Sequence, residues 1–470
     1  MPVEEKIVRS WHFVGICGIG MSALAQFAAA MQIKVSGSDR ALENLENAEL
    51  KAMLEAQGIT LYPQDGSRFA AGNPAVDAVV YSSAVEESNP EFAASKNIER
   101  IHRATALKML IMERCCEEKL SIAVAGSCGK TSTTALIAGA LCNIDCQAEC
   151  VNGGMIKAFK QGNYPGNYHP GDGALVFEAD ESDKSLLEFH PDYALVLNIG
   201  TDHYPKAELC EMFAKFVNQC GKGAVLQDEV YDLIKDEIRK DLVIRTFGSN
   251  AKADMVLKEY TTAQGASFAD FGSGLKQLPS PGRHTAMNVA ATALLLEVLG
   301  YERAAALDAA LKTQGVARRF DFKGRTANGT AVYDDYAHNP EKVANILAAA
   351  QELTGSSGKV LAFFQPHGYG PFGFMAEELG RNLKNLLREK DIFYLGEPFY
   401  AGGTSSFSPH ASEVLERWQT QFGAMPVTLA PDRPALAEAL KKNARSSDLI
   451  LIMGARDNTL ALFAASLADN

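Results

Sequence analysis

The chain has 470 residues, a length that suggests about two to four domains rather than one core. Hydrophobic residues make up 47% and charged residues 22% of the chain, which is the balance of an ordinary globular protein. The formal net charge of -12, without any long run of Lys or Arg, argues against nucleic-acid binding. The chain has no apolar stretch long enough for a transmembrane helix, so no membrane span is expected.

The cysteines and the N-terminus both favour a cytoplasmic protein. The sequence contains 9 Cys without paired metal-binding spacing, which indicates reduced thiols. No apolar segment followed by a cleavage site is evident near the N-terminus, so no signal peptide is predicted. Cys142, Cys146 and Cys150 recur at every fourth position, and we expect them to pack on one helical face rather than to bind a metal.

Residues 1–112 are predicted to form a small α/β domain around a glycine-rich turn. The segment 11–40 has the order strand, turn, helix, strand, and its turn has the pattern G-x-x-G-x-G. This spacing differs from the dinucleotide fingerprint, but Gly18 and Gly20 still allow a diphosphate to approach the helix N-terminus. Asp39 ends the second strand, where a carboxylate can contact a ribose or a base. Taken alone, the segment is also compatible with a nicotinamide-dinucleotide site or with a simple tight turn.

Residues 113–317 are predicted to form a second domain around the stretch SIAVAGSCGKTSTT, residues 121–134. An apolar strand, a glycine turn and a helix follow one another there, which is the order of a phosphate-binding loop. Lys130 can reach terminal phosphates and Thr131 can ligate Mg²⁺. The strict pattern G-x-x-x-x-G-K-[ST] is not met, because Val124 occupies the position of its first Gly. An ordinary strand-to-helix turn with a surface Lys is the alternative interpretation.

Two further strands of this domain are predicted to end in polar clusters. The strand in 173–183 ends at Glu178, and the strand in 193–204 ends near His203. Carboxyl ends of parallel strands gather ligands at one sheet edge, so we predict a Mg-nucleotide site there. A solvated acidic loop and a hydrogen-bonded structural His remain the alternatives. The acidic cluster after the first strand consists of Glu178, Asp180, Glu181 and Asp183.

Residues 318–470 repeat the alternation of strand and helix and are predicted to form a third α/β domain. Its candidate start is marked by the adjacent Arg318 and Arg319. The expected fold class is therefore α/β with three domains. The first and third are Rossmann-like, and the central one is a P-loop-type ATPase domain with a mostly parallel sheet.

A series of motifs runs along nearly the whole chain in the order GICGIGMSALA, AGSCGKTSTT, EADESD, NIGTDH, GRHTAMN, RRFD, DDYAHNP and QPH. Together they resemble the Mur ligase family, the ATP-dependent amide-forming ligases of peptidoglycan precursor synthesis. The resemblance implies an enzyme that uses ATP and Mg²⁺ and forms an acyl phosphate. The most similar branch joins UDP-N-acetylmuramate to a small amino acid, with L-alanine the expected one. A recycling ligase that joins a whole peptide is the alternative, and both a monomer and a homodimer remain open.

The resemblance also implies roles for individual residues. The implied substrate contacts are Gly18, Ile19, Gly20, Ser38, Asp39, Ser82 and Ser83 for the UDP-sugar, and His367 in the third domain. The implied ATP contacts are Gly126, Ser127, Cys128, Gly129, Lys130, Thr131, Ser132, Asn288, Arg319, Asp335 and His338. The implied metal ligands are Thr131, Glu178 and His203, and the implied catalytic residues are Lys130, Glu178, His203 and Arg319.

The chain departs from the family pattern at three places. Asn339 replaces a second His that is often found in this branch, and Asn occurs there in other members. Cys128 stands where the family often has His, which a cradle made of backbone N–H groups should tolerate. Gly368 and Pro371 stand where alanine-adding members typically have two Arg. Because Arg is the natural clamp for a carboxylate, another cation must hold the amino acid. The candidates are Arg381 and Arg456.

Overall fold

The computed structural model of the chain describes residues 9–115, 119–144, 147–200, 204–263, 265–400 and 407–468. The chain divides into two compact units. Unit 1 consists of Met1–Glu259, Asp270–Gly274 and Ala286–Val316, and unit 2 of Tyr260–Ala269, Leu275–Thr285 and Ala317–Asn470. The three predicted domains, 1–112, 113–317 and 318–470, remain a prediction. None of the described helices has the length and apolar character needed to span a bilayer.

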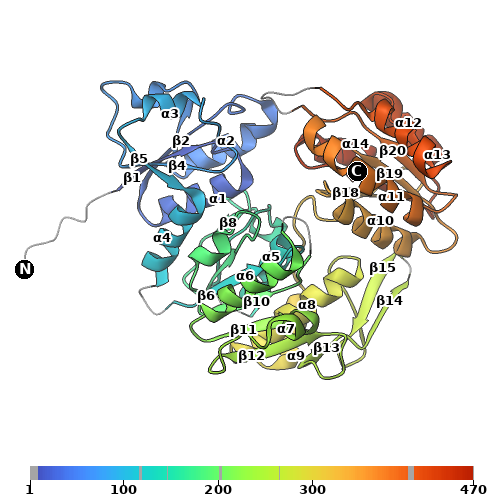
Figure 1. Cartoon of the computed structure of the whole chain (residues 1–470), viewed down its shortest axis with the longest axis horizontal. Coiled ribbons are helices and arrows are strands. Elements are labelled where there is room, and N and C mark those ends of the chain that lie inside the picture. The colour runs from blue at the N-terminus through green and yellow to red at the C-terminus, as the bar shows by residue number, and fades with distance from the viewer. Residues whose placement is uncertain are drawn as a thin grey trace, which may run out of the picture. The chain divides into compact units, whose positions relative to one another are not determined.

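The N-terminal part of unit 1 is a five-stranded parallel sheet with strand order β3-β2-β1-β4-β5 (Figure 1). The chain runs from the central β1 to one side and then returns to the other, so the order reverses between β1 and β4. Such a reversal leaves a crevice at the carboxyl ends of the strands, where ligands bind. The strands are β1 (Ser10–Val14), β2 (Lys34–Asp39), β3 (Thr60–Pro63), β4 (Ala78–Tyr81) and β5 (Glu99–His102). The helices are α1 (Ile19–Ala30), α2 (Ala48–Ala56), α3 (Pro90–Ala94) and α4 (Arg103–Cys115).

The rest of unit 1 is built on an eight-stranded sheet with order β13-β12-β11-β10-β6-β9-β7-β8. All neighbours are parallel except β7 and β8, and the buried strand β6 lies between β10 and β9. The strands are β6 (Ser121–Ala125), β7 (Glu149–Val151), β8 (Tyr168–His169), β9 (Leu175–Glu178), β10 (Tyr193–Val196), β11 (Gly223–Gln227), β12 (Val243–Gly248) and β13 (Met255–Val256). The helices are α5 (Lys130–Asn143), α6 (Lys206–Asn218), α7 (Asp228–Ile234), α8 (Arg283–Val298) and α9 (Arg303–Leu311). Short 3₁₀ helices are η1 (Leu45–Asn47), η2 (Ser67–Phe69), η3 (Lys157–Phe159) and η4 (Ser185–Glu188).

The prediction of a shared helical face for three cysteines is wrong. Helix α5 ends at Asn143, so Cys142 lies in its last turn, whereas Cys150 lies in strand β7. Cys146 lies outside the described residues. The regular spacing of these residues crosses a helix end, which the pattern of one residue type does not reveal.

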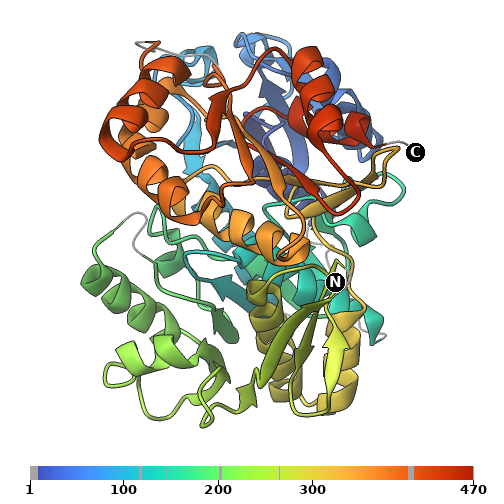
Figure 2. The ribbon, with the colours of Figure 1, turned by 90° about the vertical axis from the view of Figure 1, so that its right-hand side faces the viewer.

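Unit 2 is built on a six-stranded sheet with order β17-β18-β22-β19-β20-β21, with helices on both faces (Figures 1 and 2). Only β17 is antiparallel to its neighbour. The strands are β17 (Asp321–Arg325), β18 (Ala331–Asp335), β19 (Val360–Phe364), β20 (Ile392–Leu395), β21 (Val427–Leu429) and β22 (Leu449–Met453). Helices α10 (Pro340–Thr354), α11 (Tyr369–Leu386) and α12 (Ala411–Phe422) pack in one core, and α13 (Arg433–Asn443) and α14 (Thr459–Leu467) in a second. The predicted α/β class with mostly parallel sheets is confirmed.

A small three-stranded sheet, β14-β15-β16, was not predicted. It consists of β14 (Glu259–Ala263), β15 (Ala266–Asp270) and β16 (Leu275–Gln277), and most of its residues belong to unit 2. The residues of β14 and β16 are half-buried or exposed, β15 alternates half-buried and buried positions, and all three strands contain few large apolar residues. They therefore lack the apolar runs that identify the central strands of the larger sheets.

Asp334 is a fully buried carboxylate at the end of β18. Neither of its oxygens has a hydrogen-bond partner among the described residues, and Arg318 Nε lies 3.6 Å away. Burial raises the pKa of Asp334 to about 6, although Arg318 and Lys323 pull it down. The folded protein thus holds this proton more tightly than the unfolded chain does. The stability from this group is greatest at low pH and is lost as the pH rises from 3.8 to about 6.

We therefore expect Asp334→Asn to stabilise the protein at neutral and alkaline pH. Asn keeps the shape but not the buried charge, and a pKa change from 3.8 to about 6 corresponds to about 3 kcal/mol. Denaturant unfolding of both proteins across the pH range measures the difference in the free energy of unfolding. The difference should vanish below the pKa of a free Asp. A variant that is equally or less stable than the parent at alkaline pH would contradict the assignment.

Candidate active site

The glycine turn between β6 and α5 is held by the side chain of Asn198, which follows β10. Asn198 Oδ1 accepts a hydrogen bond from the Cys128 N–H at 2.8 Å, and its Nδ2 donates to the Cys128 carbonyl at 2.9 Å. Ser127 Oγ accepts from the N–H of Gly200 at 2.8 Å. The two Asn198 bonds hold the backbone of the turn at Cys128 directly. Asn198 was not among the predicted site residues, although its position just after a central strand could have indicated it.

Two glycines let the turn approach its neighbours closely. Gly126 has φ +138°, and a Cβ there would lie 3.0 Å from Leu197 Cβ. Gly129 has φ +90° and caps α5, and a Cβ there would lie 3.4 Å from Asn288 Oδ1. Both positions require Gly on backbone grounds. The second contact places Asn288, a predicted adenine contact on α8, beside the turn. Ser132 lies in the first turn of α5.

Lys130 begins α5 and points its ammonium into a cluster of acceptors. Its Nζ donates to the Gly126 carbonyl at 2.8 Å and forms a short ion pair with Glu181. Asp180 Oδ1 lies 3.7 Å away. Burial alone lowers the pKa of Lys130, but the charges of Glu181 and Asp180 outweigh it and the pKa is raised. Lys130 is thus a charged group, held in place by the loop that follows β9.

Thr131 and Glu178 meet next to this cluster. Thr131 Oγ1 donates to Glu178 Oε2 at 3.0 Å, and the other carboxylate oxygen accepts from the Gly153 N–H. A hydroxyl at the start of α5 and a carboxylate at the end of β9 are ligand types that fit Mg²⁺. The part of the chain that the structure describes contains no group of three or more His, Cys, Asp or Glu arranged for a metal. His203, the third predicted ligand, lies outside that part.

The turn after β1 lies at the carboxyl edge of the first sheet. Gly18 caps α1, so Ile19 and Gly20 form its first turn, and the N–H groups of that turn have no acceptor within the helix. Asp39 is engaged in shaping this turn, because its carboxylate accepts from the N–H groups of Cys17 at 2.9 Å and Ala41 at 2.8 Å. The structure thus places the predicted UDP contacts Gly18, Ile19, Gly20 and Asp39 together.

Ser38 and Ser83 have different surroundings in this domain. The Ser38 hydroxyl is fully buried and lies 3.1 Å from Nε2 of the buried His12, so it forms part of the floor beneath the turn. Burial lowers the pKa of His12 although Glu91 opposes the shift. Ser83 is exposed after β4, with its Oγ 3.1 Å from His102 Nε2, and Ser82 is half-buried beside it. His102 is a neighbour that the motifs did not indicate.

The remaining predicted contacts gather in unit 2. Asp335 accepts from the N–H groups of Phe320 at 2.6 Å and Ala337 at 2.7 Å, so its carboxylate fixes the RRFD segment. Arg319 stacks over Tyr336, with its guanidinium 5.1 Å from the ring centre. The rings of His338 and His367 lie edge to face at 5.3 Å. Burial lowers the pKa of His338 to about 3, so this imidazole is neutral.

Three family models match the chain in order. The Mur ligase family catalytic domain matches residues 10–114, the Mur ligase middle domain matches 124–296, and the Mur ligase glutamate ligase domain matches 318–456. The chain belongs to the Mur ligase family. The UDP-N-acetylmuramate--L-alanine ligase of Thermobifida fusca is similar to it, with 32% identity over 97% of this chain and 96% of the relative.

Solved structures agree with this assignment. The UDP-N-acetylmuramate-alanine ligase of Thermotoga maritima has a TM-score of 0.76 at 25% identity and covers 97% of each chain. A murein peptide ligase of Psychrobacter arcticus has a TM-score of 0.67 over 98% of each chain, and its 19% identity supports the fold alone. As a Mur ligase, the protein is an ATP-dependent enzyme that forms amide bonds.

We expect Lys130→Ala to reduce ligation by about a thousandfold or more while the affinity for the UDP-sugar is unchanged. Loss of the ammonium removes the charge that neutralises the transferring phosphate. Single-turnover ADP formation and calorimetric titration of the sugar nucleotide measure the two effects. The double variant Lys130→Ala with Glu181→Gln is the matched control, because it avoids a buried unpaired carboxylate. Loss of sugar binding in this folded control would contradict the separation of the two sites.

We expect Cys128→His to change the apparent KM for ATP by less than about twofold, because the turn is held through its backbone. Asn198→Ala should raise that KM by about tenfold, since two hydrogen bonds to the turn are lost. Steady-state kinetics of both variants with saturating sugar nucleotide measure the contrast. A large loss in the Cys128 variant together with a silent Asn198 variant would show that the thiol, not the backbone, matters.

Proposed function

We propose that this protein joins UDP-N-acetylmuramate to L-alanine in an ATP-dependent step of peptidoglycan precursor synthesis. The observation that carries the proposal is the cluster of Lys130, Thr131 and Glu178 at the carboxyl edge of the eight-stranded sheet. This cluster occurs in a chain that is similar over nearly its full length to UDP-N-acetylmuramate--L-alanine ligases. A phosphate-binding turn and a sugar-nucleotide turn in one chain fit a ligase better than an oxidoreductase.

The reaction turns a carboxylate into an acyl phosphate and then into an amide. The carboxylate oxygen of the muramyl group attacks the γ-phosphorus of ATP, and ADP leaves with the electrons of the broken P–O bond. The amine then attacks the acyl carbon, and inorganic phosphate leaves as the amide forms. Lys130 offsets the negative charge on the transferring group, and its fixed position requires no reorganisation during the step.

Mg²⁺ would be held by Thr131 and Glu178, with His203 as the further ligand that we propose. When bound, it supplies Lewis-acid stabilisation of phosphate charge. Glu178 is oriented for this role by the Gly153 N–H, which fixes one of its oxygens. Residues Arg319, Asp335 and His338 are proposed as nucleotide contacts contributed by unit 2.

The UDP part of the substrate is assigned to the crevice between β1 and β4. The N–H groups of Ile19 and Gly20 at the start of α1 suit the diphosphate, because a helix N-terminus favours anions. Ser82 and Ser83 follow β4 on the other side of the same crevice. Ser38 and Asp39 shape this site from below, through His12 and the turn backbone.

The amino acid is assigned to the edge of unit 2 near His367. Arg381 is a poor carboxylate clamp, because it pairs with Glu377 at i and i+4 on an exposed face of α11. Arg456 is the better candidate. Arg456 is exposed just after β22, and β22 pairs with β19, the strand that leads to His367. The pKa of His367 is lowered mainly by burial and, next, by the positive charge of Arg456. No ion pair to Arg456 occurs among the described residues.

The proposal is tested by ADP release with UDP-N-acetylmuramate and a panel of acceptors. L-Alanine, L-serine, glycine and a murein tripeptide are compared at equal concentrations. ADP release that requires both the sugar nucleotide and a single amino acid, with L-alanine the best, supports the proposal. Release with the tripeptide alone would favour the recycling ligase, an alternative that the absence of Arg at positions 368 and 371 motivates. If neither an amino acid nor the tripeptide supports ADP release, both hypotheses are overturned.

We expect Arg456→Ala to raise the apparent KM for the amino acid by about tenfold to a hundredfold, with the KM for ATP unchanged. The loss of one charge-assisted contact to a carboxylate costs about 1.5–3 kcal/mol. Arg381→Ala is the matched control, since it removes a paired surface cation. Pro371→Arg in the Arg456→Ala background should restore part of the affinity. Position 368 is unsuitable for this rescue, because Gly368 has φ +140° and Arg would be strained there. Equal KM values in both single variants would exclude Arg456 as the clamp.

A further inference from the structure

Asn167 is a fully buried polar residue directly before strand β8, and it joins the first turn of α1 to the eight-stranded sheet of unit 1. Its Nδ2 donates to the Ile19 carbonyl at 2.7 Å and to Ser22 Oγ at 2.8 Å. Its Oδ1 accepts from Gln26 Nε2 at 2.9 Å. These three hydrogen bonds of the Asn167 amide all go to helix α1, which lies more than a hundred residues earlier in the chain.

The backbone of Asn167 is hydrogen-bonded to the segment that leads to the proposed metal ligands. Its carbonyl accepts from the Asn152 N–H at 2.8 Å. The next residues, Gly153 and Gly154, touch the proposed metal ligands. Gly153 donates to Glu178, and a Cβ at Gly154 would lie 2.7 Å from Cγ2 of Thr131. Asn167 is thus connected to the proposed diphosphate site through its side chain and to the proposed metal ligands through its backbone.

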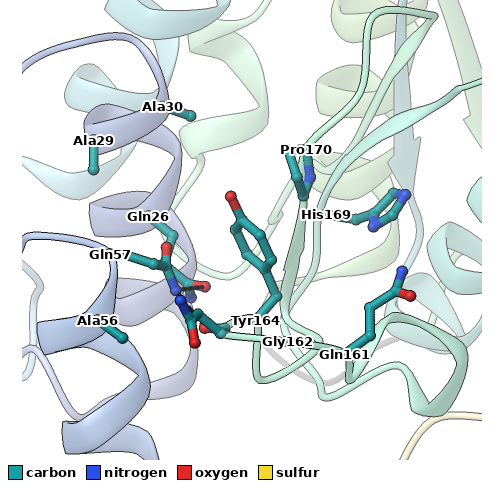
Figure 3. Close-up of a pocket in the computed structure, with 11 residues that line it drawn as sticks. Gln26, Ala29, Ala30, Ala56, Gln57, Gln161, Gly162, Tyr164, His169 and Pro170 are labelled. Carbon is teal, nitrogen blue, oxygen red and sulfur yellow. Dashed lines mark hydrogen bonds between the residues drawn. The ribbon is translucent and has the colours of Figure 1, made fainter.

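A cavity of about 560 Å³ flanks this contact (Figure 3). Figure 3 shows Gln26 and Gln57 on the side of α1 and α2, and Tyr164 and His169 across from them. Gln57 Nε2 crosses to the Asn163 carbonyl at 2.7 Å. Helix α1 borders this space only through Gln26, Ala29 and Ala30, and its other face packs in the core. At its first turn, the polar contact with the middle part of the chain is made by Asn167, through Ile19 and Ser22. Gln57 Nε2 also donates to Gln26 Oε1 at 3.1 Å, so Gln57 belongs to the same network. The exposed ion pair of Lys160 with Glu49 of α2 lies outside that network.

We infer that Asn167 is a positioning residue for the UDP-sugar. It sets the orientation of the first turn of α1, and with it the N–H groups that receive the diphosphate. The eight-stranded sheet thereby contributes to the affinity for the sugar nucleotide through a residue that does not touch the ligand. The inference rests on the proposed function, because that proposal assigns the diphosphate to the turn at Ile19. A buried amide with its donors and acceptor satisfied suits this task, since it fixes geometry without adding charge.

The test is calorimetric titration of the full-length protein with UDP-N-acetylmuramate and, separately, with Mg-ADP. We expect Asn167→Ala to raise the Kd for the sugar nucleotide by about tenfold, a loss equivalent to one or two hydrogen bonds. Asn167→Asp should raise it further, because a carboxylate oxygen would face the Ile19 carbonyl. The Kd for Mg-ADP should stay within about twofold in both variants. Lys160→Ala, which breaks only the exposed ion pair with Glu49 of α2, is the matched control and should leave both Kd values unchanged.

The two ligands separate positioning from a merely structural role. A general loss of structure would lower the melting temperature and weaken both ligands together. Unchanged sugar-nucleotide affinity in a folded Asn167→Ala protein overturns the inference, whereas failure of the parent to bind the sugar nucleotide overturns the proposed function instead. Should Asn167→Ala fail to fold, Ser22→Ala tests the same link, since Ser22 Oγ accepts from Asn167 and donates to the Gly18 carbonyl at 3.0 Å. A silent Ser22→Ala variant would then count against it.

Discussion

The ion pair between Lys130 and Glu181 is the constraint on which the nucleotide site depends. Glu181 is only 2% exposed and the Lys130 side chain 14%, so both partners are largely removed from bulk water. A phosphate that enters the turn therefore exchanges one anion for another beside a lysine already desolvated. The desolvation cost of the ammonium is met in folding rather than in binding, which is a form of preorganisation.

A second cation, Arg103 at the start of α4, borders the same acidic loop. Its guanidinium lies 3.5 Å from Asp180 and 3.6 Å from Asp183, so the acidic loop after β9 is bounded by two cations. Arg103 also lies at the sugar-nucleotide turn, 3.3 Å from where a Cβ on Gly20 would be. A chain of alternating charges thus connects the proposed diphosphate site to the proposed phosphate cradle. Exposed pairs of this kind contribute little to stability, so their value lies in fixing charge positions between the two sites.

The sequence predicted the local units of this site and missed most of the contacts between them. Each strand, glycine turn and helix is a contiguous pattern, so the units around Gly18 and Lys130 are visible in the residues alone. The pairing of Asn198 with Cys128 joins positions 70 residues apart, and that of Lys130 with Glu181 joins positions 51 apart. No periodicity specifies such pairs; they follow from which strands become neighbours. The acidic motif supplied the candidates, but not which carboxylate meets the lysine.

The burial of Ser38 was within reach of the sequence. The period of two in neighbouring strands places Ser36 and Ser38 on one face of β2, and the register pairs Ser36 with His12 of β1. A polar face inside an otherwise apolar parallel sheet indicates an internal network, here completed by Arg68 and Glu91. The motif resemblance drew attention to the serine as a ligand contact and away from this simpler geometry.

The site uses charged and neutral polar groups for different tasks. Asn198 and Asn167 fix backbone turns, and each does so with an amide that both donates and accepts, so no counter-charge is required. Lys130 needs two carboxylates and a carbonyl to remain charged in the same interior. Charged side chains therefore occur where an incoming anion can replace an existing one, and neutral amides fix the backbone of the turns. If a carboxylate replaced either amide, the turn itself would gain a titrating group, and its shape would vary with pH.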